Sequence, residues 1–135
     1  MTKGARVVAL VAAVLPMFPG TARAARYDDI TPRELRRRML DEADNGFVIL
    51  DVRDEAAYKK AHIPGAVHIP LKELGYKLAR LDKTKDIVVY CDVGLRSKVA
   101  CRVLINAGFR DVCNLTGGLK AWKYAIETSD GRVAI

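Results

Sequence analysis

The sequence lacks the long apolar segment that a membrane-spanning helix needs. Its first apolar run, Val7–Leu15, is followed within a few residues by Pro16, Pro19 and Gly20. A helix that crosses a bilayer takes about 20 consecutive apolar residues, and this run is too short and too interrupted to supply them. The absence disfavours an uncleaved membrane anchor and leaves an export signal as the expected role of the segment.

The residues around this run fit a cleavable signal peptide. Lys3 and Arg6 precede it, and Ala22-Arg23-Ala24 places small residues at the spacing that signal peptidase reads. We therefore expect residues 1–24 to be a signal peptide cleaved after Ala24 and residues 25–135 to form one domain. The mature protein is expected in the periplasm, without stable membrane association, and the sequence does not indicate its oligomeric state.

Cysteine is scarce, and the number of cysteines is odd. The chain has three, so at least one must stay free or pair outside the chain. Cys101 and Cys113 allow three interpretations: two buried apolar thiols, a disulfide, or a resolving thiol for Cys91. A free Cys91 in an oxidising compartment would need a use or a means of being kept reduced.

The chain also lacks the patterns expected of a metal protein or a nucleic-acid-binding protein. His62 and His68 are its two histidines, and neither has ligand spacing around it; we expect no metal and no cofactor. Three of the 23 basic residues lie in residues 1–24, which contain no acidic residue, so the net charge of +7 falls to +4 in the mature chain. The remaining cluster, Arg36-Arg37-Arg38, is best explained as a solvated helix face rather than a binding patch.

Short apolar runs alternate with helical patterns through the rest of the chain. Half of the residues are hydrophobic and 29% are charged, as in a soluble globular protein. This alternation predicts an α/β fold with a mostly parallel five-stranded sheet and helices on both faces. The expected strands are an extended lead-in at Tyr27–Ile30 and the runs Phe47–Leu50, Val67–Ile69, Ile87–Tyr90 and Val112–Leu115. The expected helices run from Thr31 to Asn45-Gly46, over Glu55–Lys60, Leu71–Leu81 and Arg96–Ala107 with Val99 on its apolar side, and through Ala121, Trp122 and Ala125.

The first helix begins with unusually complete signals. Thr31 is expected as its N-cap, Pro32 as its first residue, and Glu34 as the partner in a capping box. Ile30 and Leu35 are placed to form a hydrophobic staple across this start.

Three segments are expected to meet at one edge of the sheet. Asp51, Cys91 and the turn Thr116-Gly117-Gly118 each follow a predicted strand directly. Because the carboxyl ends of parallel strands lie at the same edge, and ligands bind there in open α/β sheets, this edge is the candidate site.

The segment Cys91–Ser97 reads C-D-V-G-L-R-S between a buried strand and a helix. The helix N-terminus, inward-facing loop amides, the guanidinium of Arg96 and partial exposure should together lower the pKa of Cys91. Gly94 supplies the backbone freedom that a tight loop needs. A buried structural cysteine is the alternative, but glycine, arginine and serine at these spacings favour a reactive thiolate beside an anion-binding cradle.

These residues resemble the active-site loop of single-domain rhodaneses, the thiosulfate sulfurtransferase family, which runs Cys-x-x-Gly-x-Arg-Ser. The resemblance continues through Leu50–Arg53, His62–Ala66 and Gly117–Trp122. Each motif alone is weak, but four in the family's order and spacing cover nearly all of residues 25–135. The resemblance implies a rhodanese-like domain.

The resemblance also implies a mechanism. Cys91 would take the outer sulfur of thiosulfate, a small sulfur-containing anion, as a persulfide and pass it to a thiol or cyanide. Arg96 and the backbone amides of the loop would bind the donor and stabilise the persulfide. The substrate-binding residues expected on this basis are Asp92, Val93, Gly94, Leu95, Arg96 and Ser97.

The loop length separates this chemistry from that of related enzymes. Phosphatases and arsenate reductases of the related type use Cys-x5-Arg, a wider cradle. Cys91 to Arg96 is Cys-x4-Arg, which should leave room for a sulfur atom on the cysteine but no comfortable room for phosphate. Asp92 adds a negative charge that would oppose a dianionic donor if it faced inward, so we expect it to point to solvent. A non-turnover sulfur carrier or interaction module that delivers sulfur to one protein partner is a second hypothesis.

Asp51 and Arg53 are the remaining candidates. They are expected to form a supporting ion pair behind the loop rather than to contact the substrate.

Overall fold

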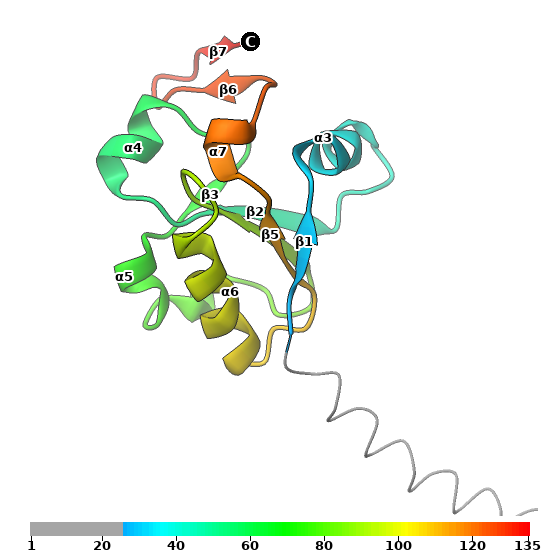
Figure 1. Ribbon diagram of the computed structural model, residues 1–135, viewed down its shortest axis with the longest axis vertical. Coiled ribbons are helices and arrows are strands. Elements are labelled where there is room, and N and C mark those ends of the chain that lie inside the picture. Colours follow the sequence, from blue (N-terminus) through cyan, green and yellow to red (C-terminus); the bar gives the residue numbers. More distant parts are fainter. Residues whose placement is uncertain (1–25) are drawn as a thin grey trace, which may run out of the picture.

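The computed structural model describes residues 26–135 and contains a parallel five-stranded sheet (Figure 1). Its strand order is β1-β5-β4-β2-β3, so β4 lies at the centre. The register pairs Leu50 of β2 with Val89 of β4, and Val88 of β4 with Cys113 of β5. The strands are β1 (Asp28–Ile30), β2 (Phe47–Asp51), β3 (Val67–His68), β4 (Asp86–Tyr90) and β5 (Val112–Leu115). The predicted α/β fold and five-stranded parallel sheet are confirmed; the predicted signal peptide lies outside the described residues.

Helices cover both faces of this sheet, as predicted (Figure 1). One apolar core joins the sheet to the face that carries α5, η1 and α6, and includes Leu74, Leu81 and Leu104. The other joins it to α3, α4 and α7, and includes Leu35 and Trp122. The helical elements are α3 (Pro32–Leu40), α4 (Glu55–Lys60), α5 (Leu71–Leu74), the 3-10 helix η1 (Leu78–Arg80), α6 (Arg96–Asn106) and α7 (Gly118–Ala121).

Helix α3 begins where the sequence predicts and ends earlier. The Thr31 hydroxyl accepts a hydrogen bond from the backbone N–H of Glu34 at 3.1 Å, and it also donates to the Glu34 carboxylate at 3.0 Å. The predicted end at Asn45-Gly46 is wrong, because the helix stops at Leu40. The carboxylate of Asp41, the C-cap, accepts from the N–H of Ala43 at 3.0 Å, which is the local side-chain bond that competes with helix continuation.

Three further helix predictions are corrected. The last helix is shorter than predicted, since α7 ends at Ala121 and Trp122 is its extended C-cap. Leu71–Leu81 is not one helix: α5 ends at Leu74, Gly75 is its C-cap, and the chain resumes as η1. Glycine costs about 1 kcal/mol relative to alanine inside a helix, which favours an end of the helix at Gly75. Val99 does not lie on the apolar side of α6 either, since it is 52% exposed while Ala100, Cys101 and Leu104 are buried.

The C-terminal residues form a small antiparallel pair, β6 (Ile126–Glu127) with β7 (Val133–Ala134). An isolated bridge between His62 and Glu127 attaches this pair to the turn before β3. Among residues 26–135, no helix combines the length and apolar character that a membrane crossing requires.

Candidate active site

Cys91 lies directly after the central strand β4 and is buried. Cys91 is 1% exposed and belongs to the apolar core that also contains Val52, Ala100 and Cys101. The predicted partial exposure is therefore wrong, because the first turn of α6 and the strand end β2 close over the side chain. A reactant must be small or must meet the sulfur through movement of the loop.

Backbone amides converge on the sulfur, as the loop sequence predicts. The N–H groups of Gly94 and Ser97 point at Cys91 Sγ, with N–S distances of 3.2 and 3.3 Å. Gly94 has φ +95°, and a Cβ there would meet the Gly117 nitrogen at 3.4 Å. Leu95, the residue before α6, supplies no side-chain cap, so Sγ satisfies the Ser97 N–H in the first turn of the helix.

This environment lowers the pKa of Cys91. Burial acts to raise that pKa, but it is outweighed by the side-chain hydrogen bond between Cys91 and Ser97 and by hydrogen bonds to the sulfur from the N–H groups of Ser97, Gly94 and Val93. Burial instead dominates at Cys101, where it raises the thiol pKa to about 12, and it also raises the pKa of Cys113. Of the three cysteines, only Cys91 has a pKa that is lowered and therefore favours the thiolate.

We expect alkylation to distinguish these thiols. Because the thiolate is the nucleophile and its fraction grows as pH rises through the pKa, Cys91 should react with iodoacetamide at a lower pH than a free cysteine in a peptide. Cys101 and Cys113 should stay unlabelled in the folded protein at neutral pH. Peptide mass mapping over a pH series measures all three, and labelling of Cys101 before Cys91 would contradict the assignment.

Asp92 is held between two guanidinium groups rather than facing the sulfur. Its carboxylate lies 3.4 Å from Arg53 Nη1 and 3.1 Å from Arg96 Nη2. The side chains of Asp92 and Arg96 are each about half exposed. Arg96, the residue expected to bind the anionic group of the donor, is therefore already paired with the Asp92 carboxylate, which also contacts Arg53.

Asp51 and Arg53 form a buried ion pair behind the loop. Arg53 Nη2 lies 2.7 Å from Asp51 Oδ2, and Arg53 Nε lies 3.0 Å from Asp51 Oδ1. The same guanidinium donates to the carbonyl of Ala61 at 2.5 Å. Both side chains are almost fully enclosed, and the pair joins the end of β2 to the loop through Asp92.

The turn after β5 closes the edge from the other side. The N–H of Leu119 donates to the Cys91 carbonyl at 2.8 Å, and the N–H of Lys120 donates to the Asp92 carbonyl at 2.9 Å. Gly118 has φ +61° and lies so close that a Cβ would come within 2.4 Å of the Cys91 oxygen. The three segments predicted to meet at one edge do meet there.

One buried polar residue of the site, Asn114, was not predicted from the sequence. Asn114 of β5 is 2% exposed, and its Oδ1 accepts a hydrogen bond from the Ser97 hydroxyl at 2.5 Å. Its Nδ2 lies 3.4 Å from Asp29 Oδ1. The signal was an amide in an otherwise apolar strand, V-C-N-L, since a buried polar side chain needs a partner.

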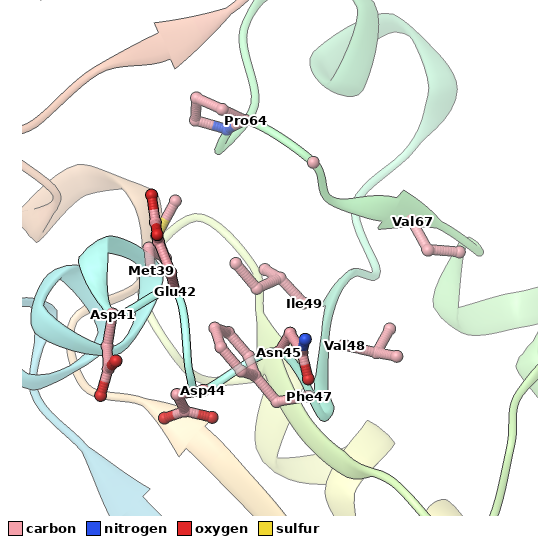
Figure 2. Close-up of a pocket in the computed structure, with 11 residues that line it drawn as sticks. Met39, Asp41, Glu42, Asp44, Asn45, Phe47, Val48, Ile49, Pro64 and Val67 are labelled. Carbon is pink, nitrogen blue, oxygen red and sulfur yellow. The ribbon is translucent and has the colours of Figure 1, made fainter.

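Two cavities lie at different ends of the sheet. A cavity of about 330 Å³ borders the loop at Arg96 and is otherwise lined by Val52, Asp54, Pro70, Leu71 and Lys72. Another, of about 410 Å³, lies beside the first residues of β2, with Met39, Phe47 and Val67 on its walls (Figure 2). Because Cys91 follows the last residue of β4 and Phe47 pairs with the first, the second cavity is at the opposite edge of the sheet from the thiol.

The other two cysteines are free thiols, and the histidines and Trp122 make structural contacts. Cys101 is a buried free thiol and Cys113 a half-buried one. His62 and His68 both stack on Tyr58, with ring centroids 3.8 and 4.5 Å apart. Trp122 lies in the core and donates through its indole N–H to the Ala125 carbonyl at 2.9 Å.

A family comparison agrees with this geometry. Residues 31–125 match the model of the rhodanese-like domain. The chain belongs to the rhodanese family. That stretch contains the Cys91 loop, the Asp51–Arg53 pair and the Gly117-Gly118 turn, so the resemblance identified from the motifs is confirmed.

Rhodanese relatives of similar length include sulfurtransferases. The chain is 39% identical over 83 residues to thiosulfate sulfurtransferase GlpE of Coxiella burnetii, covering 62% of this chain and 78% of the relative. It is 33% identical over 95 residues to a sulfurtransferase of Allochromatium vinosum, covering 70% and 87%. A Staphylococcus aureus rhodanese-like domain protein of known structure superimposes with a TM-score of 0.70 at 28% identity, covering 76% and 98%.

Other relatives are longer proteins. A Bacillus subtilis protein named as a sulfur carrier is 41% identical over 81 residues, which cover 60% of this chain and 44% of that protein. A Mycobacterium tuberculosis adenylyltransferase/sulfurtransferase named MoeZ is matched over 26% of its length. The chain thus spans less than half of these two relatives, and together the family and its relatives support a general role in sulfur transfer.

Proposed function

We propose that the protein is a sulfurtransferase that carries sulfur as a persulfide on Cys91. The observation that carries the proposal is the cradle of N–H groups on a buried sulfur whose pKa is lowered. In the first step the thiolate attacks the outer sulfur of thiosulfate, the bond between the two sulfur atoms of the donor breaks, and sulfite leaves with its electron pair. The negative charge then lies on the outer persulfide sulfur.

A second displacement returns the enzyme to its starting state. Cyanide attacks the outer sulfur, the Cys91 sulfur leaves as thiolate, and thiocyanate is released; a thiol acceptor becomes a persulfide by the same exchange. The thiolate exists before the donor arrives, so neither step needs a general base. Lys72 and Arg96 border the cavity beside the loop and supply positive charge where an anionic donor would approach.

Turnover of thiosulfate with cyanide tests this function. We expect thiocyanate to form with the wild-type protein and to fall to the uncatalysed level with Cys91→Ser. Cys113→Ser is the matched control, because that thiol is half-buried and lies outside the loop; it should retain activity. Equal activity in wild type and Cys91→Ser, or none with any sulfane donor, would contradict the proposal, whereas Cys91-dependent hydrolysis of an aryl phosphate would indicate an oxyanion-processing enzyme.

A second candidate is a sulfur carrier that delivers to a protein partner. The observation in its favour is a set of exposed apolar side chains at the rim of the loop: Val93, Leu95 and Val99, which are 50%, 67% and 52% exposed. Apolar side chains that are exposed beside a reactive loop would suit contact with a partner protein. A carrier would hold a stable persulfide with negligible turnover to cyanide, so rapid thiocyanate formation argues against it.

Freeing Arg96 should improve binding of an anionic donor. We predict that Asp92→Asn lowers the KM for thiosulfate by up to about fivefold, because the exposed Asp92–Arg96 pair is worth roughly 0.2–1 kcal/mol. The effect should shrink at high salt. Steady-state kinetics at two ionic strengths measure it, and an unchanged or higher KM would indicate that Arg96 does not bind the donor.

We also propose that the protein is exported and acts in the periplasm. The support is the order of charge, apolar run and small residues in residues 1–24. The N-terminal sequence of the protein recovered from a periplasmic fraction should begin at Ala25. Retention of Met1 in a cytoplasmic fraction would contradict this proposal.

A further inference from the structure

A chain of hydrogen bonds, buried except at its last link to Asp29, leads from the reactive sulfur to β1. Cys91 Sγ lies 3.4 Å from Ser97 Oγ, Ser97 Oγ lies 2.5 Å from Asn114 Oδ1, and Asn114 Nδ2 lies 3.4 Å from Asp29 Oδ1. Ser97 and Asn114 are buried. Water therefore cannot replace Ser97 or Asn114 as a hydrogen-bond partner without a change in packing.

The Ser97 hydroxyl has one hydrogen and two neighbours that can accept it. In the arrangement observed, Ser97 donates to Asn114 and accepts from the Cys91 thiol. A thiolate has no hydrogen to give, so the Ser97 hydroxyl stabilises it only when the hydroxyl hydrogen turns toward the sulfur. The two acceptors therefore compete for a single proton.

The orientation of the Asn114 amide decides which acceptor is favoured. An amide turned by 180° would donate to Ser97 and free the hydroxyl for the sulfur, but it would place Oδ1 against the Asp29 carboxylate. Since a carboxylate accepts and does not donate, Asp29 keeps Nδ2 on its own side and Oδ1 toward Ser97.

We propose that Asn114 is a positioning residue that, oriented by Asp29, holds the hydroxyl hydrogen of Ser97 away from Cys91 and so limits how much of the cysteine is present as thiolate. The backbone N–H groups of the loop act in the opposite direction. The catalytic meaning of this restraint rests on the proposed sulfurtransferase function, whereas the restraint itself does not.

Titration of the thiolate by its ultraviolet absorbance, with Cys91→Ser as the baseline, tests the proposal. We expect Asn114→Leu and Asn114→Ala to lower the pKa of Cys91 by about 0.5–1 unit, the size of one hydrogen bond gained by the thiolate. The two variants differ in volume but both remove the acceptor. The pKa of about 12 at Cys101 keeps its titration separate.

A double-mutant cycle separates positioning from packing. In the Asn114→Leu background, Ser97→Ala should raise the pKa of Cys91, because it removes the hydroxyl that is then free to turn toward the thiolate. In the Ser97→Ala background, Asn114→Leu should produce no shift, since its effect passes through the hydroxyl. A shift of equal size in both backgrounds would overturn the proposal, as would an unchanged or raised pKa in both single Asn114 variants.

Two exposed aspartates of β1 provide a test that leaves the core intact. Asp29→Ala should lower the pKa of Cys91, because the Asn114 amide can then turn and release the Ser97 hydroxyl. Asp28→Ala removes the same charge one residue away without touching Asn114 and is the matched control. Equal shifts in the two variants would show an effect of charge alone and contradict the role assigned to Asp29 and Asn114.

These titrations use no sulfur donor, so they can fail separately from the proposed function. A wild-type protein that forms no thiocyanate but shows the Asn114-dependent shift would contradict the sulfurtransferase proposal and keep this one. Normal thiocyanate formation without the shift would do the reverse.

Discussion

Gly118→Ala is expected to destabilise the protein by about 3 kcal/mol, as the combined result of a left-handed backbone and an overpacked contact. Gly118 has φ +61°, and a Cβ there would lie 2.4 Å from the Cys91 oxygen and 2.6 Å from the Asp92 oxygen. Both neighbours are backbone atoms and cannot move aside as a flexible side chain would. The backbone of Cys91 and Asp92 would have to shift to admit the Cβ, and this shift should also disturb the loop amides. Persulfide loading should therefore fall together with the free energy of unfolding.

Gly65→Ala is the matched control for this prediction. Gly65 has φ +82°, but nothing lies within 4 Å of a Cβ at that position. It should therefore show only the backbone cost, roughly 1 kcal/mol, with normal persulfide loading. Urea unfolding of both variants measures the difference, and equal destabilisation would show that the close approach to Cys91 does not matter.

Arg53→Ala is expected to destabilise the protein by roughly 3–5 kcal/mol, because it leaves a buried carboxylate without its cation. Asp51 is 0% exposed and Arg53 3% exposed. The guanidinium also donates to the Ala61 carbonyl and contacts Asp92, so its removal loosens both the strand end and the reactive loop. Urea unfolding followed by circular dichroism measures the loss.

A double replacement is the control for the buried pair. Asp51→Asn combined with Arg53→Met removes both charges at similar volume, and such replacements of a whole pair are often close to neutral. We expect this variant to be at least about 2 kcal/mol more stable than Arg53→Ala alone. If the two variants unfold at the same urea concentration, the isolated charge is not the cause of the instability.

The sequence predicts the edge of the sheet at which the site forms, because the signals are local. Apolar runs that end at Asp51, Cys91 and Thr116 place three segments at the carboxyl ends of β2, β4 and β5. The cap Thr31 is found where expected, since its bond involves a residue three positions away.

What the sequence does not predict depends on contacts between distant residues. Asn114 meets Ser97 across 17 positions and Asp29 across 85, and nothing local in V-C-N-L indicates which groups it faces. Asp92 is half exposed, as expected, but its contact with Arg53, 39 positions away, is not predicted. The burial of Cys91 likewise results from packing between β4 and α6, which no pattern within the loop encodes.

The mass of the protein after exposure to thiosulfate tests the central claim most directly. The purified protein is incubated with thiosulfate, desalted without reductant and measured intact and as peptides. We predict a gain of one sulfur atom on the peptide that contains Cys91, its removal by cyanide, and no gain in Cys91→Ser. A wild-type protein that gains no sulfur from thiosulfate or any other sulfane donor, or a gain that persists in Cys91→Ser, would contradict it.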